Sequence, residues 1–273
     1  MIKINKFLYI HWLFVVMAVF CYINRQLENF VMSFIIMSVH ELSHLLSAKC
    51  IGLKCSHITI YPFGLNLKLK NTIIYNLSDE IILYLSGPFS NIIMSLVVLL
   101  IGFRNEYYID FYYKNLALFL INILPIIPLD GGMIIKKVLN YHLGYDGGNK
   151  AIKVISIIFL VVLLTLFTVL LYNRKFNPSI CIFVVFIIGN IFCSKEKYDT
   201  NLLKELLYAR DKTKKQKKYA RVIGVDEKTN TMDIAKKFRP NENCFVFLTD
   251  ENSRIKNILS KDEIIDNLCE KRL

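Results

Sequence analysis

Two histidines and a glutamate lie within the segment SVHELSHLLSAKC, residues 38–50. On a helix, residues four positions apart share a face, so His40 and His44 can hold one metal ion from two successive turns. Glu41 lies on a neighbouring face, from which it can act as general base towards a water molecule at the metal. This spacing predicts a zinc hydrolase. The alternative, a chance match of buried core histidines, is disfavoured because ionisable residues in an apolar segment are costly and usually functional.

Zinc held by two histidines needs a third protein ligand and an open position. Few other ionisable residues lie in the apolar segments, and Asp130, in NILPIIPLDGG (residues 122–132), is the best placed. The two prolines of this segment predict a break in the helix, and the two glycines after the aspartate predict a tight turn. A broken helix at membrane depth is tolerated only where protein buries it or water reaches it. The alternative is that Asp130 merely ends a helix in a cytoplasmic turn.

The chain around these residues is too apolar for an ordinary soluble domain, since 54% of its 273 residues are hydrophobic. Lysines and arginines gather before the first apolar run, after the second, after the fourth and after the last. By the positive-inside rule both termini face the cytoplasm, and the three expected ligands reach the same depth near that face. Runs of spanning length predict six membrane helices: 7–23, 30–50, 81–103, 110–135, 154–172 and the short 179–193.

The remaining sequence predicts a polytopic α-helical membrane protein with a small cytoplasmic α/β domain at its C-terminus. We expect a membrane domain over residues 1–195, a basic linker over 196–220 and the small domain over 221–273. The net charge of +12 lies mostly in the cytoplasmic loops and the tail. It favours contact with anionic lipid head groups of the bilayer or with an acidic partner. Nucleic acid is not an expected partner for a segment held this close to a membrane.

Local patterns predict further elements outside the membrane helices. Residues 56–71 alternate apolar and polar side chains around a Pro-Gly turn, which indicates a β-hairpin that either pairs with an extended peptide or only connects two spans. The tail shows the order β-α-β-β-α. Its expected elements are strands 221–225, 244–250 and 254–259, helix 231–238 capped by Thr231, and helix 260–271 opened by the capping box Ser260–Glu263.

Three motifs together, HELSH, SGPFSN (residues 86–91) and NILPIIPLDGG, closely resemble the site-2 protease family of intramembrane zinc metalloproteases. The tail resembles a CBS module and no PDZ-like insertion is present, as in the stage IV sporulation protein FB group. The resemblance implies that zinc is the cofactor, with His40, His44 and Asp130 as its ligands and Glu41 as the general base.

The same resemblance implies that Asn122 and Pro128 line the substrate cleft, with Asn122 holding the substrate backbone. In the sporulation group the substrate is the membrane-associated precursor of a late sigma factor. Its pro-segment is removed at the mother-cell membrane around the forespore, under control of inhibitory membrane partners. CBS modules usually occur in pairs and the tail supplies one, so we expect a homo-oligomer formed through this domain and a response to ATP. Asn257 departs from the glycine common in the family.

Three other functions compete with this one. The substrate could be another membrane-tethered regulator. A metal transporter could use the same three ligands, but it predicts symmetric halves and further polar residues across the bilayer, whereas the last two predicted spans are almost wholly apolar. An inactive scaffold would bind substrate without cutting, and the complete set of His, Glu, His and Asp disfavours it.

Overall fold

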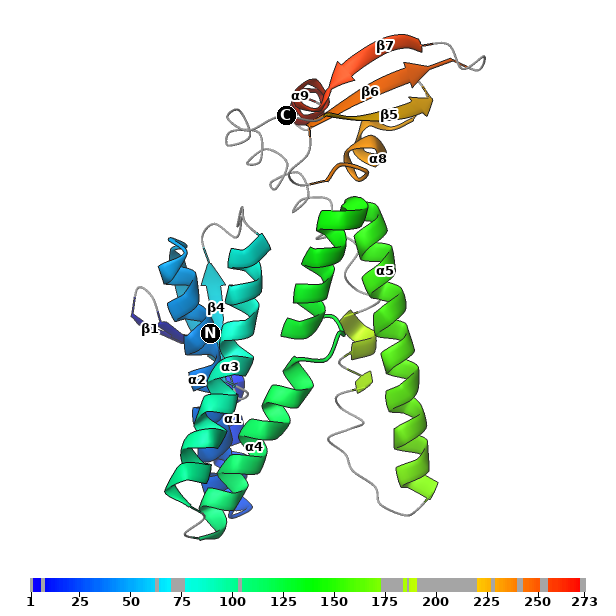
Figure 1. Ribbon diagram of the computed structural model, residues 1–273. Helices are drawn as coiled ribbons and strands as arrows, with labels where there is room; N and C mark the ends of the chain where they lie inside the picture. Colours follow the sequence, from blue (N-terminus) through cyan, green and yellow to red (C-terminus); the bar gives the residue numbers. More distant parts are fainter. Residues whose placement is uncertain are drawn as a thin grey trace. The chain divides into compact units, whose positions relative to one another are not determined.

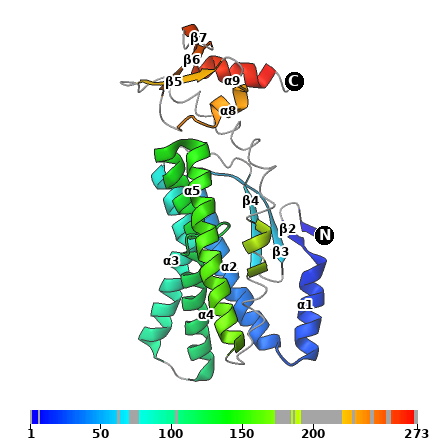
Figure 2. The same ribbon diagram turned by 90° about the vertical axis from the view of Figure 1, so that its right-hand side faces the viewer.

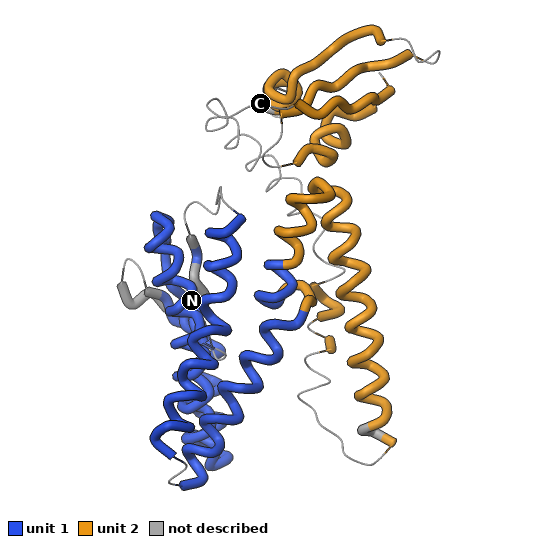
Figure 3. Tube along the Cα trace, in the orientation of Figure 1, with its two compact units in different colours: residues 1–124, 129–134 blue, residues 125–128, 135–273 orange. Residues whose placement is uncertain are grey.

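The chain in this computed structural model forms two compact units (Figure 3). One consists of residues 1–124 and 129–134, and the other of residues 125–128 and 135–273. The described residues are 2–5, 8–61, 64–69, 77–102, 105–172, 184–185, 187–190, 220–226, 229–239, 243–250 and 255–270.

The described part of the first unit contains the four helices α1 to α4 (Figures 1 and 2). Helix α2 packs against α3, and α3 packs against α4. All four helices keep large aliphatic or aromatic side chains exposed, as expected for surfaces that face lipid. Their bounds are Trp12–Ile23 for α1, Leu27–Cys50 for α2, Leu77–Ile101 for α3 and Glu106–Asn122 for α4.

A four-stranded sheet lies beside these helices, in the order β1 (Ile2–Asn5), β2 (Leu8–Ile10), β3 (Cys55–Tyr61) and β4 (Gly64–Leu69). Strands β3 and β4 are antiparallel, which confirms the predicted hairpin. The hairpin lies against α2 through a glycine: a Cβ on Gly64 would be 2.4 Å from Met37 Cγ. A side chain at this position is therefore excluded by both space and its φ of +120°.

The first predicted span was wrong over its opening residues. Leu8–Ile10 form a strand that pairs in parallel with Ile58–Ile60, so the helix begins only at Trp12 and has 12 residues. Among the described residues, three helical stretches are long and apolar enough to cross a membrane: Leu27–Cys50, Leu77–Ile101 and Asp130–Val169. The predicted span 179–193 falls mostly outside the described residues. The chain is a membrane protein by these helices, and six spans remain a prediction.

The predicted break in span 110–135 is confirmed, because α4 ends at Asn122 and α5 begins at Asp130. The role predicted for the glycines was wrong, since Gly131 lies in the first turn of α5 and not in a tight turn. A Cβ on Gly131 would be 2.2 Å from the carbonyl oxygen of Ile123. Gly131 therefore lets the first turn of α5 lie directly on the backbone that follows α4.

Helix α5 (Asp130–Tyr172) begins in the first unit and continues in the second, where it is interrupted at Gly144, which has φ 81° and ψ 169°. The residues expected to form a cytoplasmic loop between spans four and five are thus helical on both sides of this bend. Immediately after it, the side chain of Tyr145 is buried in the core of the tail, among residues that include Val225 and Phe238. The backbone N–H of Asp146 donates to the carbonyl of Lys236 at 2.9 Å.

The tail has the predicted order β-α-β-β-α (Figure 1). Its sheet order is β5-β6-β7, with the first pair parallel and the second antiparallel. The capping box is confirmed: Glu263 Oε2 accepts from Ser260 N at 2.7 Å, and Ser260 Oγ accepts from Glu263 N at 3.2 Å. The elements are β5 (Ala220–Asp226), α8 (Thr231–Ala235), β6 (Asn243–Thr249), β7 (Ile255–Ser260) and α9 (Lys261–Glu270).

The cap predicted for α8 was wrong. Asn230, not Thr231, occupies the N-cap, and its Oδ1 accepts from Met232 N at 3.2 Å. The helix also ends at Ala235 and not at 238. Asparagine and threonine are both common N-cap residues, so residue type alone could not decide between Asn230 and Thr231.

Candidate metal centre

The side chains of His40, His44 and Asp130 meet at one point in the first unit. The distance from His40 Nε2 to Asp130 Oδ2 is 3.2 Å, from His44 Nε2 to Asp130 Oδ2 it is 3.3 Å, and the two Nε2 atoms are 3.3 Å apart. The histidines come from successive turns of α2, and the aspartate is the first residue of α5. The break between α4 and α5 is what starts a new helix at this position.

These distances fit a zinc ion. Ligand nitrogen and oxygen atoms lie about 2.0–2.2 Å from zinc, so two of them at a tetrahedral centre are roughly 3.3–3.5 Å apart. The three observed separations, 3.2, 3.3 and 3.3 Å, match this spacing. Within the described part of the chain, buried Asp130 Oδ2 has no hydrogen-bond partner, although the Nε2 atoms of both imidazoles face it. Two imidazoles and one carboxylate are also a donor set that catalytic zinc uses.

The ring of His44 is oriented by helix α3. Its Nδ1 lies 2.7 Å from the carbonyl oxygen of Leu83 and 3.2 Å from Ser86 Oγ. A carbonyl can only accept, so Nδ1 carries the proton and donates it. The neutral ring then has its lone pair on Nε2, which is the atom that faces Asp130. This is the usual arrangement for a metal-ligating histidine, whose second nitrogen is held by a backbone carbonyl.

Gly87 lets α3 approach both histidines. A Cβ on Gly87 would be 2.3 Å from His44 Nε2 and 2.7 Å from His40 Cε1. Sequence reasoning assigned no role to Gly87 or Leu83, although the segment 86–91 was cited as a family motif. The available signal was a Ser-Gly pair inside an apolar run, since small residues in membrane helices often mark close helix contacts.

Glu41 lies between the two histidines in α2 and is partly buried. Its carboxylate interacts electrostatically with His44, His40 and Asp130. His40 is almost fully buried, with 2% of its surface exposed. The centre is therefore a shielded cluster of four ionisable side chains, in which three can bind one metal ion and the fourth lies beside them.

The other two predicted site residues flank the break between α4 and α5. Asn122 is the last residue of α4, and its side-chain amide donates to the carbonyl of Leu118 in the same helix at 3.1 Å. The Ile127–Pro128 peptide bond is cis, two residues before Asp130. Neither is among the three side chains that could hold one metal ion. Their assignment to a substrate cleft stays a prediction.

No family model matches the chain. A solved structure, the site-2 protease from Methanocaldococcus jannaschii, aligns with a TM-score of 0.51 and 21% identity over 70% of this chain and 92% of that one. At this identity the likeness shows the fold alone. The fold and the cluster of two histidines and an aspartate thus place the chain in the class of helical membrane proteins with a site-2 protease architecture.

Two curated relatives narrow this class. The zinc metalloprotease MJ0392 of Methanocaldococcus jannaschii is 28% identical over 128 residues, covering 44% of this chain and 37% of the relative. The stage IV sporulation protein FB of Bacillus subtilis is 22% identical over 120 residues, covering 42% of each. The alignments thus span about two fifths of the relatives' length. The resemblance to the site-2 protease family of intramembrane zinc metalloproteases, predicted from the sequence, is confirmed.

Proposed function

We propose that this protein is an intramembrane zinc endopeptidase that cleaves a membrane-associated protein substrate. The observation that carries the proposal is the cluster of His40, His44 and Asp130, whose three ligand atoms are 3.2–3.3 Å apart beside Glu41. The named relatives support it, because one is a zinc metalloprotease and the aligned structure is a site-2 protease.

In this reaction the four side chains have distinct tasks. A zinc ion held by the two histidines and the aspartate supplies Lewis acidity for the scissile carbonyl and for the attacking water. Glu41 takes the proton from that water as it attacks, and then passes it to the leaving amine. Leu83 and Ser86 keep the proton of His44 on Nδ1, so that its Nε2 remains a ligand.

The finer assignment follows the likeness to the stage IV sporulation protein FB. The proposed substrate is the precursor of a sporulation sigma factor, cut near the cytoplasmic face of the mother-cell membrane under the control of inhibitory membrane proteins. Asn122 and Pro128 are the proposed substrate-binding residues. The proposal also includes six membrane spans with both termini in the cytoplasm. Its last part is a CBS-like tail that pairs between two chains and binds ATP. The β-α-β-β-α order of the tail supports the CBS-like assignment.

Replacing the proposed base tests the activity. We expect Glu41→Gln to retain bound zinc and to lose cleavage by about 10²–10⁴-fold, the usual contribution of a general base. Glu28→Gln is a matched control in the first turn of the same helix, and it should keep both properties. Zinc is counted in the purified protein, and cleavage is followed on a membrane-bound sigma factor precursor and on an unrelated single-span protein.

Each result decides between the competing functions. Unchanged cleavage by Glu41→Gln would refute the assigned base. Zinc transport into vesicles by this variant would favour a transporter. Cleavage of the unrelated protein but not of the sigma factor precursor would leave the endopeptidase standing and remove the sporulation substrate.

A further inference from the structure

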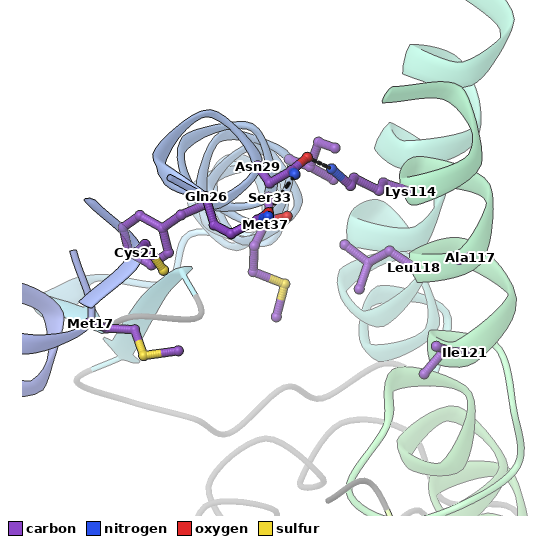
Figure 4. A pocket seen from close by; sticks show the side chains of 12 residues that line it. Met17, Cys21, Gln26, Asn29, Ser33, Met37, Lys114, Ala117, Leu118 and Ile121 are labelled. Carbon is purple, nitrogen blue, oxygen red and sulfur yellow. Dashed lines mark hydrogen bonds between the residues drawn. The ribbon is translucent and has the colours of Figure 1, made fainter. Parts of the chain in front are cut away.

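A cavity of about 620 Å³ lies in the first unit between α1, α2 and α4 (Figure 4). Its walls are apolar along most of their length, with Met17 from α1, Met37 from α2, and Leu118 and Ile121 from α4. None of the four ionisable residues of the metal centre lines it. The cavity is therefore lined by residues other than those of the metal centre, and its wall on α2 ends one turn before Glu41.

One end of the cavity is polar. Lys114 reaches from α4 to α2, where its Nζ donates to Asn29 Oδ1 at 2.9 Å (Figure 4) and contacts Met32 Sδ at 3.5 Å. The side-chain amide of Asn29 in turn donates to Gln26 Oε1 at 2.8 Å. The side chains in this chain of contacts, those of Asn29, Met32 and Gln26, are all uncharged. Among the described residues, the carboxylate that pairs with Lys114 is that of Asp110, 4.0 Å away and itself 59% exposed.

Within the described part of the chain, the charge on Lys114 is thus only weakly balanced. Lys114 lies on α4, which belongs to the same unit as α2 and α3, two helices that are long and apolar enough to cross a membrane. A lysine at membrane depth is costly, and it usually faces a counter-charge or the head-group region. The side chain is 32% exposed, and it borders the apolar cavity at the end where α2 begins. An anion placed here would lie beside a positive charge at one end of the apolar cavity. This combination selects an amphiphile.

The size of the cavity decides which amphiphile fits. A helix about 10–12 Å wide fills roughly 500 Å³ per turn, so a cavity of 620 Å³ encloses little more than one turn of a spanning peptide helix. The volume lies within the range of about 300–1,000 Å³ that small ligands occupy. Methionine side chains adapt readily to a flexible apolar ligand. A single hydrocarbon chain with an anionic head satisfies both the shape and the charge.

We propose that this cavity binds an anionic phospholipid, with one acyl chain between α1, α2 and α4 and the phosphate at Lys114. The site goes beyond the proposed proteolysis and does not depend on it. Since Ile36 and Met37 of α2 line the cavity, a bound chain packs against the helix that carries both histidines.

The test uses the purified full chain in phosphatidylcholine nanodiscs containing a trace of spin-labelled lipid. Immobilised lipid is measured by electron paramagnetic resonance with labelled phosphatidylglycerol and, separately, labelled phosphatidylcholine. The unmodified protein should prefer phosphatidylglycerol by about fivefold, the preference expected from one lysine near a bilayer surface. Lys114→Met should abolish this preference, whereas Lys49→Met, the same change at an exposed position near the other end of α2, should retain it.

A second variant tests the acyl-chain part. Ala117 lines the cavity, and Ala117→Phe should reduce immobilised lipid for both head groups because the ring occupies part of the cavity. Bound zinc, counted in each variant, reports whether the fold is intact. The proposal is overturned if the unmodified protein shows no head-group preference or if intact Lys114→Met keeps it. It is also overturned if a single-span peptide, and not unlabelled phosphatidylglycerol, displaces the label.

Discussion

At the scale of single residues, the metal centre depends on contacts of two kinds. His40 and His44 share a face because of their spacing along one helix, so the sequence was enough to pair them. The contacts of Gly87 and Leu83 with the histidines arise only when α3 packs on α2, and no spacing in the chain encodes that approach. The pairing of the two histidines could therefore be predicted, while the residues that contact their rings could not.

Gly87→Ala tests the close approach of α3. The added methyl group would overlap His44 Nε2, from which it would be 2.3 Å away. The imidazole must then shift, and we expect zinc affinity to fall by about 10–100-fold, as when a residue supporting a metal ligand is lost. Gly189→Ala is the matched control, because a Cβ there meets no atom within 4 Å. Zinc affinity is measured by competition with a chromophoric chelator, and equal affinity in the two variants would contradict the contact.

At the scale of elements, the sequence predicted the type of most helices and strands correctly, but it predicted their first and last residues less well. The prolines of residues 122–132 correctly predicted the break before Asp130, because proline removes a backbone donor wherever it stands. The start of α1 was missed, because Leu8–Ile10 are as apolar as a membrane helix and only their pairing with β3 makes them a strand. Such pairing joins residues about fifty positions apart, beyond the reach of a local pattern.

The cap of α8 gives an element-scale prediction. Asn230→Ala should destabilise the first turn of α8 by about 1 kcal/mol, because it removes the acceptor for Met232 N. Thr231→Ala, one residue further on, should have a much smaller effect. Hydrogen exchange of the α8 amides in the full chain measures both. A larger effect at Thr231 would restore the cap expected from the sequence.

At the scale of the whole molecule, the sequence predicted a membrane part and a small α/β tail. The resemblance to the site-2 protease family is confirmed, and the CBS-like character of the tail stays a prediction. The number of spans could not be settled in the same way, because apolar length alone does not separate a membrane helix from a short helix preceded by a strand. The structure adds that neither compact unit is one continuous stretch of chain. Residues 125–128 belong to the second unit, and residues 129–134 belong to the first.

Metal removal should affect the stability of the first unit as a whole. A ligand that binds only the folded state raises stability by RT ln(1 + [L]/Kd), about 2.7 kcal/mol at a hundredfold excess over Kd. We therefore expect a chelator to lower the unfolding temperature in detergent, and added zinc to restore it. In His40→Ala the chelator should have almost no effect. A chelator effect of equal size in both proteins would place the bound metal elsewhere.

The Gly144 bend changes where the tail begins. Tyr145 has only 6% of its surface exposed within the core that the tail strands and helices enclose, yet it precedes the first of those strands by some seventy residues. A fragment that begins at residue 220 would consequently have a cavity in place of the Tyr145 ring. The carbonyl of Lys236 would also lose the hydrogen bond that the backbone N–H of Asp146 donates. The tail is one continuous segment of the sequence, but its core is completed by Tyr145 from α5. Replacing the tail by another domain would therefore require replacing this part of α5 as well.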